Sequence, residues 1–138
     1  MSGRVFFDTN VLIYADDQAD AARAVKAQEL IAAALRSSTG VISTQVLQEY
    51  FVVATRKLGV APAVARRKVE LFANLEVVVV DLAVILAAID LHRLHAISFW
   101  DALIVQAAAA AGCATLLTQD LQHGQVLQGV RITDPFAA

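Results

Sequence analysis

Short apolar segments alternate with longer amphipathic segments along most of this chain. The short segments are rich in valine, leucine and isoleucine, and they predict strands at residues 4–7, 41–42, 77–80, 114–117 and 130–133. The run at 77–80 consists of four consecutive valines, a pattern typical of a strand that is covered on both faces.

The longer segments carry apolar residues at helical spacing, and they predict helices at residues 21–35, 45–58, 62–75, 82–95 and 98–111. The second of these helices has an apolar face made of Val46, Leu47, Tyr50, Phe51 and Ala54. Glu49 falls at the margin of this face, from which its carboxylate could reach into a cleft. The acidic segment 16–20 is interpreted as the approach to the helix at 21–35, because a helix N-terminus favours nearby acids.

The alternation of strands and helices predicts an α/β sandwich with a mainly parallel sheet. A length of 138 residues suits one domain, which we expect to cover residues 1–138. In sheets of this kind, ligands bind beyond the carboxyl ends of the strands, at the point where the strand order reverses.

The composition is unusually apolar, with 58% hydrophobic residues and a mean hydropathy of +0.60. Either a sheet buried on both faces or an apolar surface kept for a partner would account for this excess. No apolar run approaches the roughly 18 residues of a membrane span, and a strand so close to Met1 leaves no room for a signal peptide. Cys113 is the single cysteine, so we expect it to be a buried small side chain in a cytoplasmic protein.

The charge pattern argues against a broadly basic nucleic-acid-binding surface, because the net charge is −2. The basic run at residues 66–68 is interpreted as a solvated helix face, with a phosphate-facing role as the alternative. His92 and His95 lack the accompanying cysteines and histidines of a zinc site, and we expect them on the surface.

Four acidic residues are candidates for a metal site. Asp8 and Asp120 each follow the carboxyl end of a predicted strand, so they meet at one edge of the sheet if those strands are neighbours. Asp101 at a helix start and Glu49 at a helix margin could join them. Four carboxylates close together repel one another unless protons or cations lie between them. An all-oxygen ligand set favours Mg²⁺ or Mn²⁺, as one ion or two.

Other interpretations of these acids remain open from the residues alone. Asp8 could cap its loop, and Asp101 could form a capping box with Ser98. A glycosidase needs only two acids and normally an aromatic sugar platform. An aspartyl-phosphate phosphatase would use Asp8 as the nucleophile, but Asn10 stands where that chemistry commonly has a second aspartate. A binding module without catalysis would not need all four acids.

Four short motifs occur in order along the chain: FDTNVL at 7–12, ISTQVLQE at 42–49, SFWDALI at 98–104 and LTQDL at 117–121. Together they resemble the PIN-domain family in its VapC-like toxin branch. The resemblance implies a three-layer sandwich with helices on both faces of a five-stranded sheet of order 3-2-1-4-5. It also implies a metal-dependent ribonuclease, with Asp8, Glu49, Asp101 and Asp120 in the positions of the family's acidic residues. Asn10 and Thr118 match polar positions beside them.

The resemblance further implies an RNA substrate and a partner, since members of this branch are usually half of a toxin-antitoxin pair. The apolar excess predicts a homodimer or a bound partner, and the resemblance implies that this partner is an antitoxin. The amphipathic helices at 21–35 and 45–58 are the expected docking surface, and a basic side chain of the antitoxin could enter the acidic site.

Overall fold

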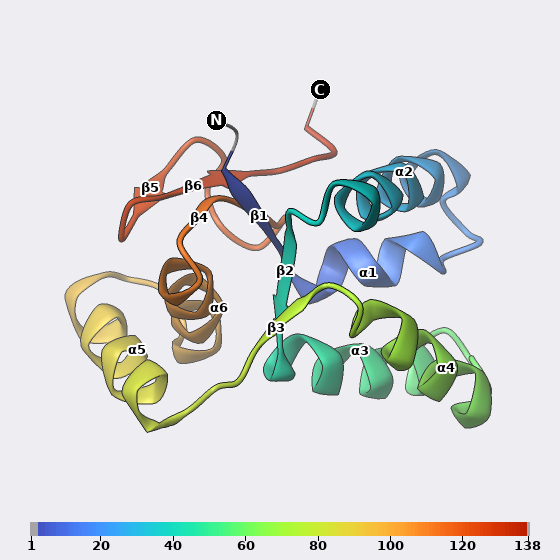
Figure 1. Cartoon of the computed structure of the whole chain (residues 1–138), viewed down its shortest axis with the longest axis horizontal. Coiled ribbons are helices and arrows are strands. Elements are labelled where there is room, and N and C mark those ends of the chain that lie inside the picture. The colour runs from blue at the N-terminus through green and yellow to red at the C-terminus, as the bar shows by residue number, and fades with distance from the viewer. Residues whose placement is uncertain (1–2, 138) are drawn as a thin grey trace.

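The computed structural model describes residues 3–137 as a sheet flanked by helices on both sides. Figure 1 shows α5 and α6 on one side of the central strands and α1 to α4 on the other. The elements in chain order are β1 (Arg4–Phe7), α1 (Thr9–Ala15), α2 (Ala21–Ser37), β2 (Gly40–Ser43), α3 (Thr44–Arg56), α4 (Pro62–Phe72), β3 (Glu76–Val78), α5 (Leu82–Leu94), α6 (Phe99–Ala110), β4 (Cys113–Leu117), β5 (Val126–Leu127) and β6 (Val130–Thr133).

The sheet has the order β3-β2-β1-β4-β6-β5. All pairs from β3 to β6 are parallel, and β6 is the fifth strand that the sequence predicts, so the predicted order 3-2-1-4-5 is confirmed. The two-residue strand β5 was not predicted. It pairs antiparallel with β6 and forms one edge of the sheet.

One helix is missing from the sequence-based prediction. Residues 9–15 form α1, whereas the sequence pattern placed only a loop and the acidic approach to the next helix between residues 8 and 20. The core side chains of α1, Val11 and Leu12, are fully buried. A helix of 7 residues spans only about two turns, which is too short to display a clear periodic pattern.

The valine run at 77–80 is less buried than predicted. Only Val77 and Val78 lie in β3, where they are partly exposed, and Val79 beyond the strand is 67% exposed. The prediction of a strand covered on both faces is wrong because β3 is an edge strand of the sheet. Sequence composition cannot reveal that position.

Gly40 is the first residue of β2 and lies one residue before the strand that the sequence pattern predicts. A Cβ atom at this position would lie 2.6 Å from Leu75 Cδ2 and 2.8 Å from the Cβ of Ala34. The glycine therefore allows α2 and the segment before β3 to pack closely against the strand.

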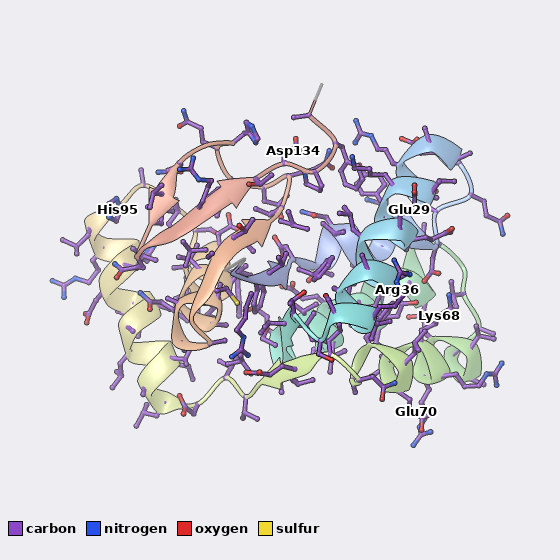
Figure 2. The ribbon with its side chains drawn as sticks, turned by 45° about the horizontal axis from the view of Figure 1, so that its top comes forward. Glu29, Arg36, Lys68, Glu70, His95 and Asp134 are labelled. Carbon is purple, nitrogen blue, oxygen red and sulfur yellow. The ribbon has the colours of Figure 1, made fainter. Side chains whose placement is uncertain are left out.

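The basic run at residues 66–68 includes exposed side chains and one, Lys68, that is half-buried. Arg66 pairs with Glu70 at 3.3 Å on the exposed face of α4, as a solvated helix face predicts. Lys68 instead contacts the Asp16 carboxylate, with 2.8 Å between Nζ and Oδ1. Figure 2 shows Lys68 on the side of α4 that faces α2, while Glu70 points away from the protein. Lys68 is therefore a packing residue and not a phosphate ligand.

The apolar excess is shared between the core and the surface. Helix α6 contributes six of its 12 residues to the core. Several large apolar side chains are nevertheless exposed on the helices: Val25, Phe51, Val52, Val64, Leu71, Leu82, Leu86, Ile89 and Leu94. Phe51 was expected in the buried face of its helix, but it is 38% exposed. Within residues 3–137, no helix is both long and apolar enough to span a bilayer.

Candidate active site at the carboxyl ends of β1 and β4

The two central strands place their following residues side by side. β1 and β4 are parallel neighbours, and Phe7 is in register with Leu117. The backbone N–H of Asp8 donates to the Leu117 carbonyl at 3.0 Å. Asp8 and Thr118 thus leave the sheet together at its carboxyl edge, where ligands bind in sheets of this type.

Asp8 is a deeply buried carboxylate, only 4% exposed. Its Oδ1 accepts a hydrogen bond from the Thr9 N–H at 2.7 Å, and its Oδ2 accepts one from the Thr118 hydroxyl at 2.7 Å. Burial raises the pKa of Asp8 to about 7, and the nearby charges of Asp120 and Glu49 also raise it, while the two hydrogen bonds lower it. Asp8 is both the N-cap of α1 and a member of an acidic group.

Thr118 contacts two polar side chains and one backbone amide of the site. This fully buried hydroxyl donates to Asp8 and accepts from the Asp120 N–H at 3.0 Å. Asn10 Nδ2 also donates to it, at 3.4 Å. Because one hydroxyl makes these contacts, Thr118 fixes the loop after β4 relative to the start of α1.

Glu49 reaches the same edge of the sheet from α3. Its Oε1 accepts a hydrogen bond from the Thr9 hydroxyl at 2.7 Å, and its Oε2 accepts one from Gln45 Nε2 at 3.3 Å. Gln45 Nε2 also donates to the Trp100 carbonyl at 3.2 Å, so it connects Glu49 to the first turn of α6.

Thr9 and Gln45 were not among the residues that the sequence pattern singled out. Both lie within the short motifs, and Gln45 precedes Glu49 by four residues, a spacing that places two side chains together on a helix. This spacing is the sequence signal from which the contact of Gln45 with Glu49 could have been predicted. The partner of Thr9 is 40 residues away in the chain, so its contact could not be read from the sequence.

Asp101 lies in the first turn of α6, where the Ser98 side chain caps the helix by accepting from the Asp101 N–H at 3.0 Å. Burial raises the pKa of the Asp101 carboxyl, its hydrogen bond with Ser98 lowers that pKa, and the charges of Asp120 and Glu49 raise it further. Asp120 and Glu49 act on both Asp8 and Asp101, so all four acids belong to one electrostatic cluster.

The four acids lack the cation that would normally compensate them. Among residues 3–137, no Lys, Arg or His side chain lies within 4 Å of the carboxylates of Asp8, Glu49, Asp101 or Asp120. Nor do any three His, Cys, Asp or Glu side chains of the described chain already form a complete metal cage. Asp120 is the exposed member of the four.

The donor atoms at this edge fit a hard divalent cation. The four acids offer only carboxylate oxygens, which Mg²⁺ and Mn²⁺ prefer. Asn10 Oδ1 and Gln45 Oε1 are buried acceptors without a hydrogen-bond partner in residues 3–137. Buried oxygens of this kind are costly unless a donor, a water or an ion contacts them. Chemically, the residues present suit a site for such an ion.

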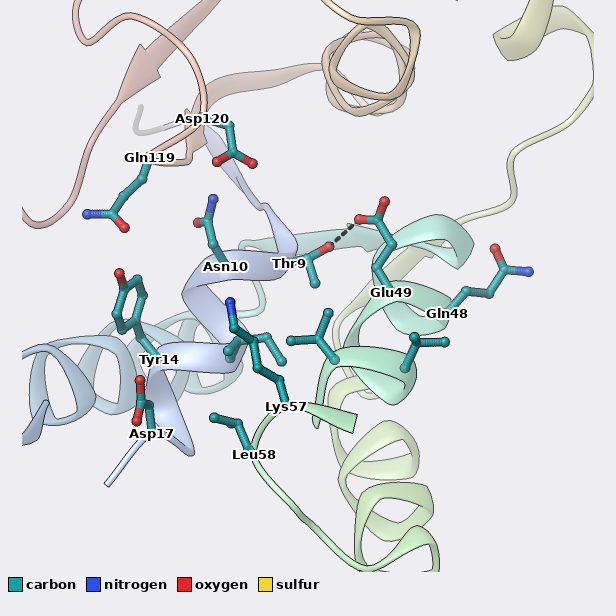
Figure 3. Close-up of a pocket in the computed structure, with 13 residues that line it drawn as sticks. Thr9, Asn10, Tyr14, Asp17, Gln48, Glu49, Lys57, Leu58, Gln119 and Asp120 are labelled. Atoms are coloured by element: carbon teal, nitrogen blue, oxygen red, sulfur yellow. Dashed lines mark hydrogen bonds between the residues drawn. The ribbon is translucent and has the colours of Figure 1, made fainter. Parts of the chain in front are cut away.

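A cavity of about 680 Å³ opens beside the acids, between α1, α3 and the loop after β4. Figure 3 shows Asp120, Asn10 and Glu49 around one end of it and Lys57, Leu58 and Asp17 toward the other. The residues that line it are Thr9, Asn10, Ile13, Tyr14, Asp17, Gln48, Glu49, Val52, Val53, Lys57, Leu58, Gln119 and Asp120.

The remaining candidates lie away from this edge. His92 and His95 are exposed on α5 and after it, and His92 Nδ1 lies 2.7 Å from the Ile97 carbonyl. Cys113 is buried, as expected, and burial raises the pKa of its thiol to about 11. Asp20 caps α2, whereas Asp16 lies at the C-terminus of α1 and is not part of a helix start.

Comparison with known proteins supports the family to which the motifs point. The sequence profile of the PIN domain matches residues 5–126. None of the curated protein sequences is similar enough to count as a match.

Solved structures show the same fold. The DNA-bound VapBC structure from Salmonella typhimurium is 23% identical with a TM-score of 0.71, covering 98% of this chain and 99% of that one. VapC20 of Mycobacterium tuberculosis, described as a sarcin-ricin loop cleaving toxin, is 23% identical with a TM-score of 0.65, covering 81% of this chain and 86% of that one. A toxin-antitoxin complex from Klebsiella pneumoniae is 18% identical with a TM-score of 0.70, covering 97% and 99%.

The sheet order, the acidic edge and the profile match over residues 5–126 agree with one another. The chain therefore belongs to the PIN-domain family.

Proposed function

We propose that this chain is a metal-dependent endoribonuclease that acts as the toxin of a type II toxin-antitoxin pair. The observation that carries the proposal is the cluster of four carboxylates without a nearby cation, located beside an open cavity at the carboxyl edge of the sheet. A purely structural role would not favour four uncompensated acids, because their mutual repulsion destabilises the fold.

In this proposal, Asp8, Asp101 and Asp120 hold one or two Mg²⁺ or Mn²⁺ ions, and Glu49 binds through a water or positions the attacking water. A bound ion would supply an activated water and would neutralise charge on the phosphate. The protein's own contribution is rigidity: Thr118 fixes Asp8, while Thr9 and Gln45 fix the two oxygens of Glu49. Such bonds restrict the rotamers of Asp8 and Glu49.

Three of the structural relatives support the assignment to RNA and to an antitoxin. VapC20 is described as a sarcin-ricin loop cleaving toxin. The Klebsiella structure is described as a toxin-antitoxin complex, and the Salmonella structure as VapBC bound to DNA. For this chain, both the substrate class and the partner are proposals.

The exposed apolar side chains suit the proposed partners. Val25 on α2 and Phe51 and Val52 on α3 are exposed on the helices that the sequence pattern suggested for docking, and they suit an antitoxin. Leu82, Leu86 and Ile89 follow one another at helical spacing on α5 and suit a second copy of the chain. Light scattering of the purified chain is expected to give the mass of a dimer, and a monomer would contradict this part of the proposal.

The test of the activity compares the wild type with Asp8→Asn on a panel of structured and unstructured RNAs. With Mn²⁺ the wild type is expected to cleave, and excess EDTA or the substitution should lower the rate by about 10³-fold or more, because the ion is no longer held. Asp90→Asn removes an exposed acid of α5 and serves as the matched control. Full activity of Asp8→Asn, or full activity in EDTA, would refute the proposal.

The alternative enzyme is an aspartyl-phosphate phosphatase with Asp8 as the nucleophile. Both oxygens of Asp8 already accept hydrogen bonds, and the side chain is only 4% exposed. A buried and doubly bonded carboxylate is poorly placed to attack a phosphate. The metal-dependent nuclease is therefore the better-supported function.

A further inference from the structure

Gln45 is a buried amide that connects α3 to α6. The residue is 6% exposed, and its Nε2 donates to two acceptors, Glu49 Oε2 at 3.3 Å and the Trp100 carbonyl at 3.2 Å. An amide NH2 group has two hydrogens, so these contacts use both of its donors. Among residues 3–137, no other hydrogen bond joins α3 to α6. Gln45 therefore connects one acid of the candidate site to the first turn of the helix that carries Asp101.

The two partners determine which way the amide of Gln45 faces. A carboxylate and a backbone carbonyl are acceptors only, so the NH2 end has to face them and the carbonyl end has to face away. In this orientation Gln45 Oε1 is a buried acceptor, and no donor within residues 3–137 contacts it. A buried acceptor without a partner destabilises a fold. Because an apolar side chain of similar length would avoid this loss, the stability of the fold alone does not explain a glutamine at this position.

The orientation of Glu49 is what the contact with Gln45 provides. Glu49 is only partly buried, and its long side chain has several rotamers available. The Thr9 hydroxyl donates to Glu49 Oε1 at 2.7 Å (Figure 3), and Gln45 donates to Oε2. Thr9 belongs to α1, whose N-cap is Asp8, whereas Gln45 is bonded to α6. The Glu49 carboxylate is therefore held from both sides by the elements that carry other acids of the site.

We infer that Gln45 is a positioning residue of the metal site, which acts by holding the Glu49 carboxylate against the first turn of α6. The inference rests on the proposed function, because it requires that the four acids bind Mg²⁺ or Mn²⁺. Groups that orient the ligands of a metal without touching it contribute about 10- to 100-fold to the affinity. Gln45 thus strengthens metal binding through Glu49 and slightly destabilises the metal-free protein.

The experiment measures two properties of each variant, namely Mn²⁺ binding by titration calorimetry and urea unfolding in EDTA. Gln45→Met keeps the approximate length of the side chain and removes the amide. It is expected to weaken Mn²⁺ binding by about tenfold. Its urea midpoint in EDTA should equal or exceed that of the wild type, because the unpaired buried acceptor is gone. A purely structural residue would give the reverse, a lower midpoint with unchanged binding by the folded protein.

A double-mutant cycle tests whether Gln45 acts through Glu49. Glu49→Ala should weaken Mn²⁺ binding at least as much as Gln45→Met does. Adding Gln45→Met to Glu49→Ala should then change the affinity no further.

Gln28→Met is the matched control for the loss of a glutamine amide. Gln28 Nε2 also donates to a backbone carbonyl, that of Ala15 at 2.9 Å, but it does so on the exposed surface of α2. This variant should bind Mn²⁺ as the wild type does. Gln45→Asn is a second variant at the position itself, and it keeps the inference testable if Gln45→Met does not fold. Its amide is one methylene shorter and cannot reach both partners, so it should also weaken Mn²⁺ binding.

The outcomes distinguish this inference from the proposed function. If the wild type binds Mn²⁺ and cleaves RNA, but the folded Gln45 variants bind Mn²⁺ as Gln28→Met does, Gln45 has no positioning role and the ribonuclease proposal stands. If the losses from Gln45→Met and Glu49→Ala multiply, Gln45 does not act through Glu49, and the inference is likewise overturned. If the wild type neither binds Mn²⁺ nor cleaves RNA, the proposed function fails and the inference fails with it.

Discussion

Helix α1 has a mostly buried carboxylate at each end, and the two differ in whether a nearby cation compensates their charge. Asp16 at the C-terminus has a side chain that is 11% exposed, and it accepts hydrogen bonds from Lys68 Nζ at 2.8 Å and from the Tyr50 hydroxyl. Asp8 at the N-terminus is 4% exposed, but it accepts only from neutral donors and lies near two further acids.

The difference separates a structural acid from an acid that is a candidate for function. The Asp16 charge is compensated within the protein, and the bonds join α1 to α3 and α4. Burial and the Asp16 carboxylate together raise the pKa of Tyr50, so the phenol remains a donor. Within residues 3–137 no cation compensates the charge of Asp8, and the pKa of its carboxyl is raised. Sites with that property are candidates for function, because a ligand can supply the missing compensation.

The largest expected effect on stability comes from Asp8→Asn in metal-free protein. The pKa of Asp8 is about 7 in the folded state and near 3.8 in the unfolded state, so between these values the folded state binds the extra proton. The stabilisation from this proton is complete below pH 4 and lost as the pH rises to 7. The asparagine does not titrate, and the variant should be about 1–3 kcal/mol more stable than the wild type at pH 8, with little difference at pH 4.

Urea unfolding at pH 4 and pH 8 in EDTA measures this effect. Addition of Mg²⁺ at pH 8 should stabilise the wild type more than the variant, because binding to the folded state shifts unfolding by mass action. If the difference in stability between the variant and the wild type is the same at pH 4 and pH 8 without metal, the charge of Asp8 does not destabilise the folded protein.

A smaller effect of opposite sign is expected from Asp16→Asn. The substitution removes the ion pair with Lys68 and weakens the bond to the buried Tyr50 hydroxyl, so the variant should lose about 1–2 kcal/mol of stability. Its cleavage rate per folded molecule should match the wild type. Urea unfolding and an RNA cleavage assay on the same preparation check both statements. A stabilised variant, or one that folds but does not cleave, would remove the distinction between the two ends of α1.

Lys68 and Val79 show the limit of structure prediction from the sequence pattern alone. The pattern predicted the α/β sandwich, five strands and the approximate extent of five helices, because burial imposes periodicity on long segments. The strand order came from the resemblance of the four motifs to the PIN-domain family. It assigned Lys68 to a solvated face and the run around Val79 to a buried strand. Both assignments depended on which element lies alongside, and neighbours in space are not encoded in local spacing.

The candidate site divides in the same way. The sequence by itself determined the four acids and their order along the chain, because a carboxylate that follows an apolar strand or starts an apolar helix is conspicuous in one dimension. Thr9 and Gln45 acquired their significance only in the folded protein, where Thr9 meets Glu49 and Gln45 meets the backbone of Trp100. Hydrogen bonds and cavities depend on distances across the fold, and only the tertiary structure fixes those distances.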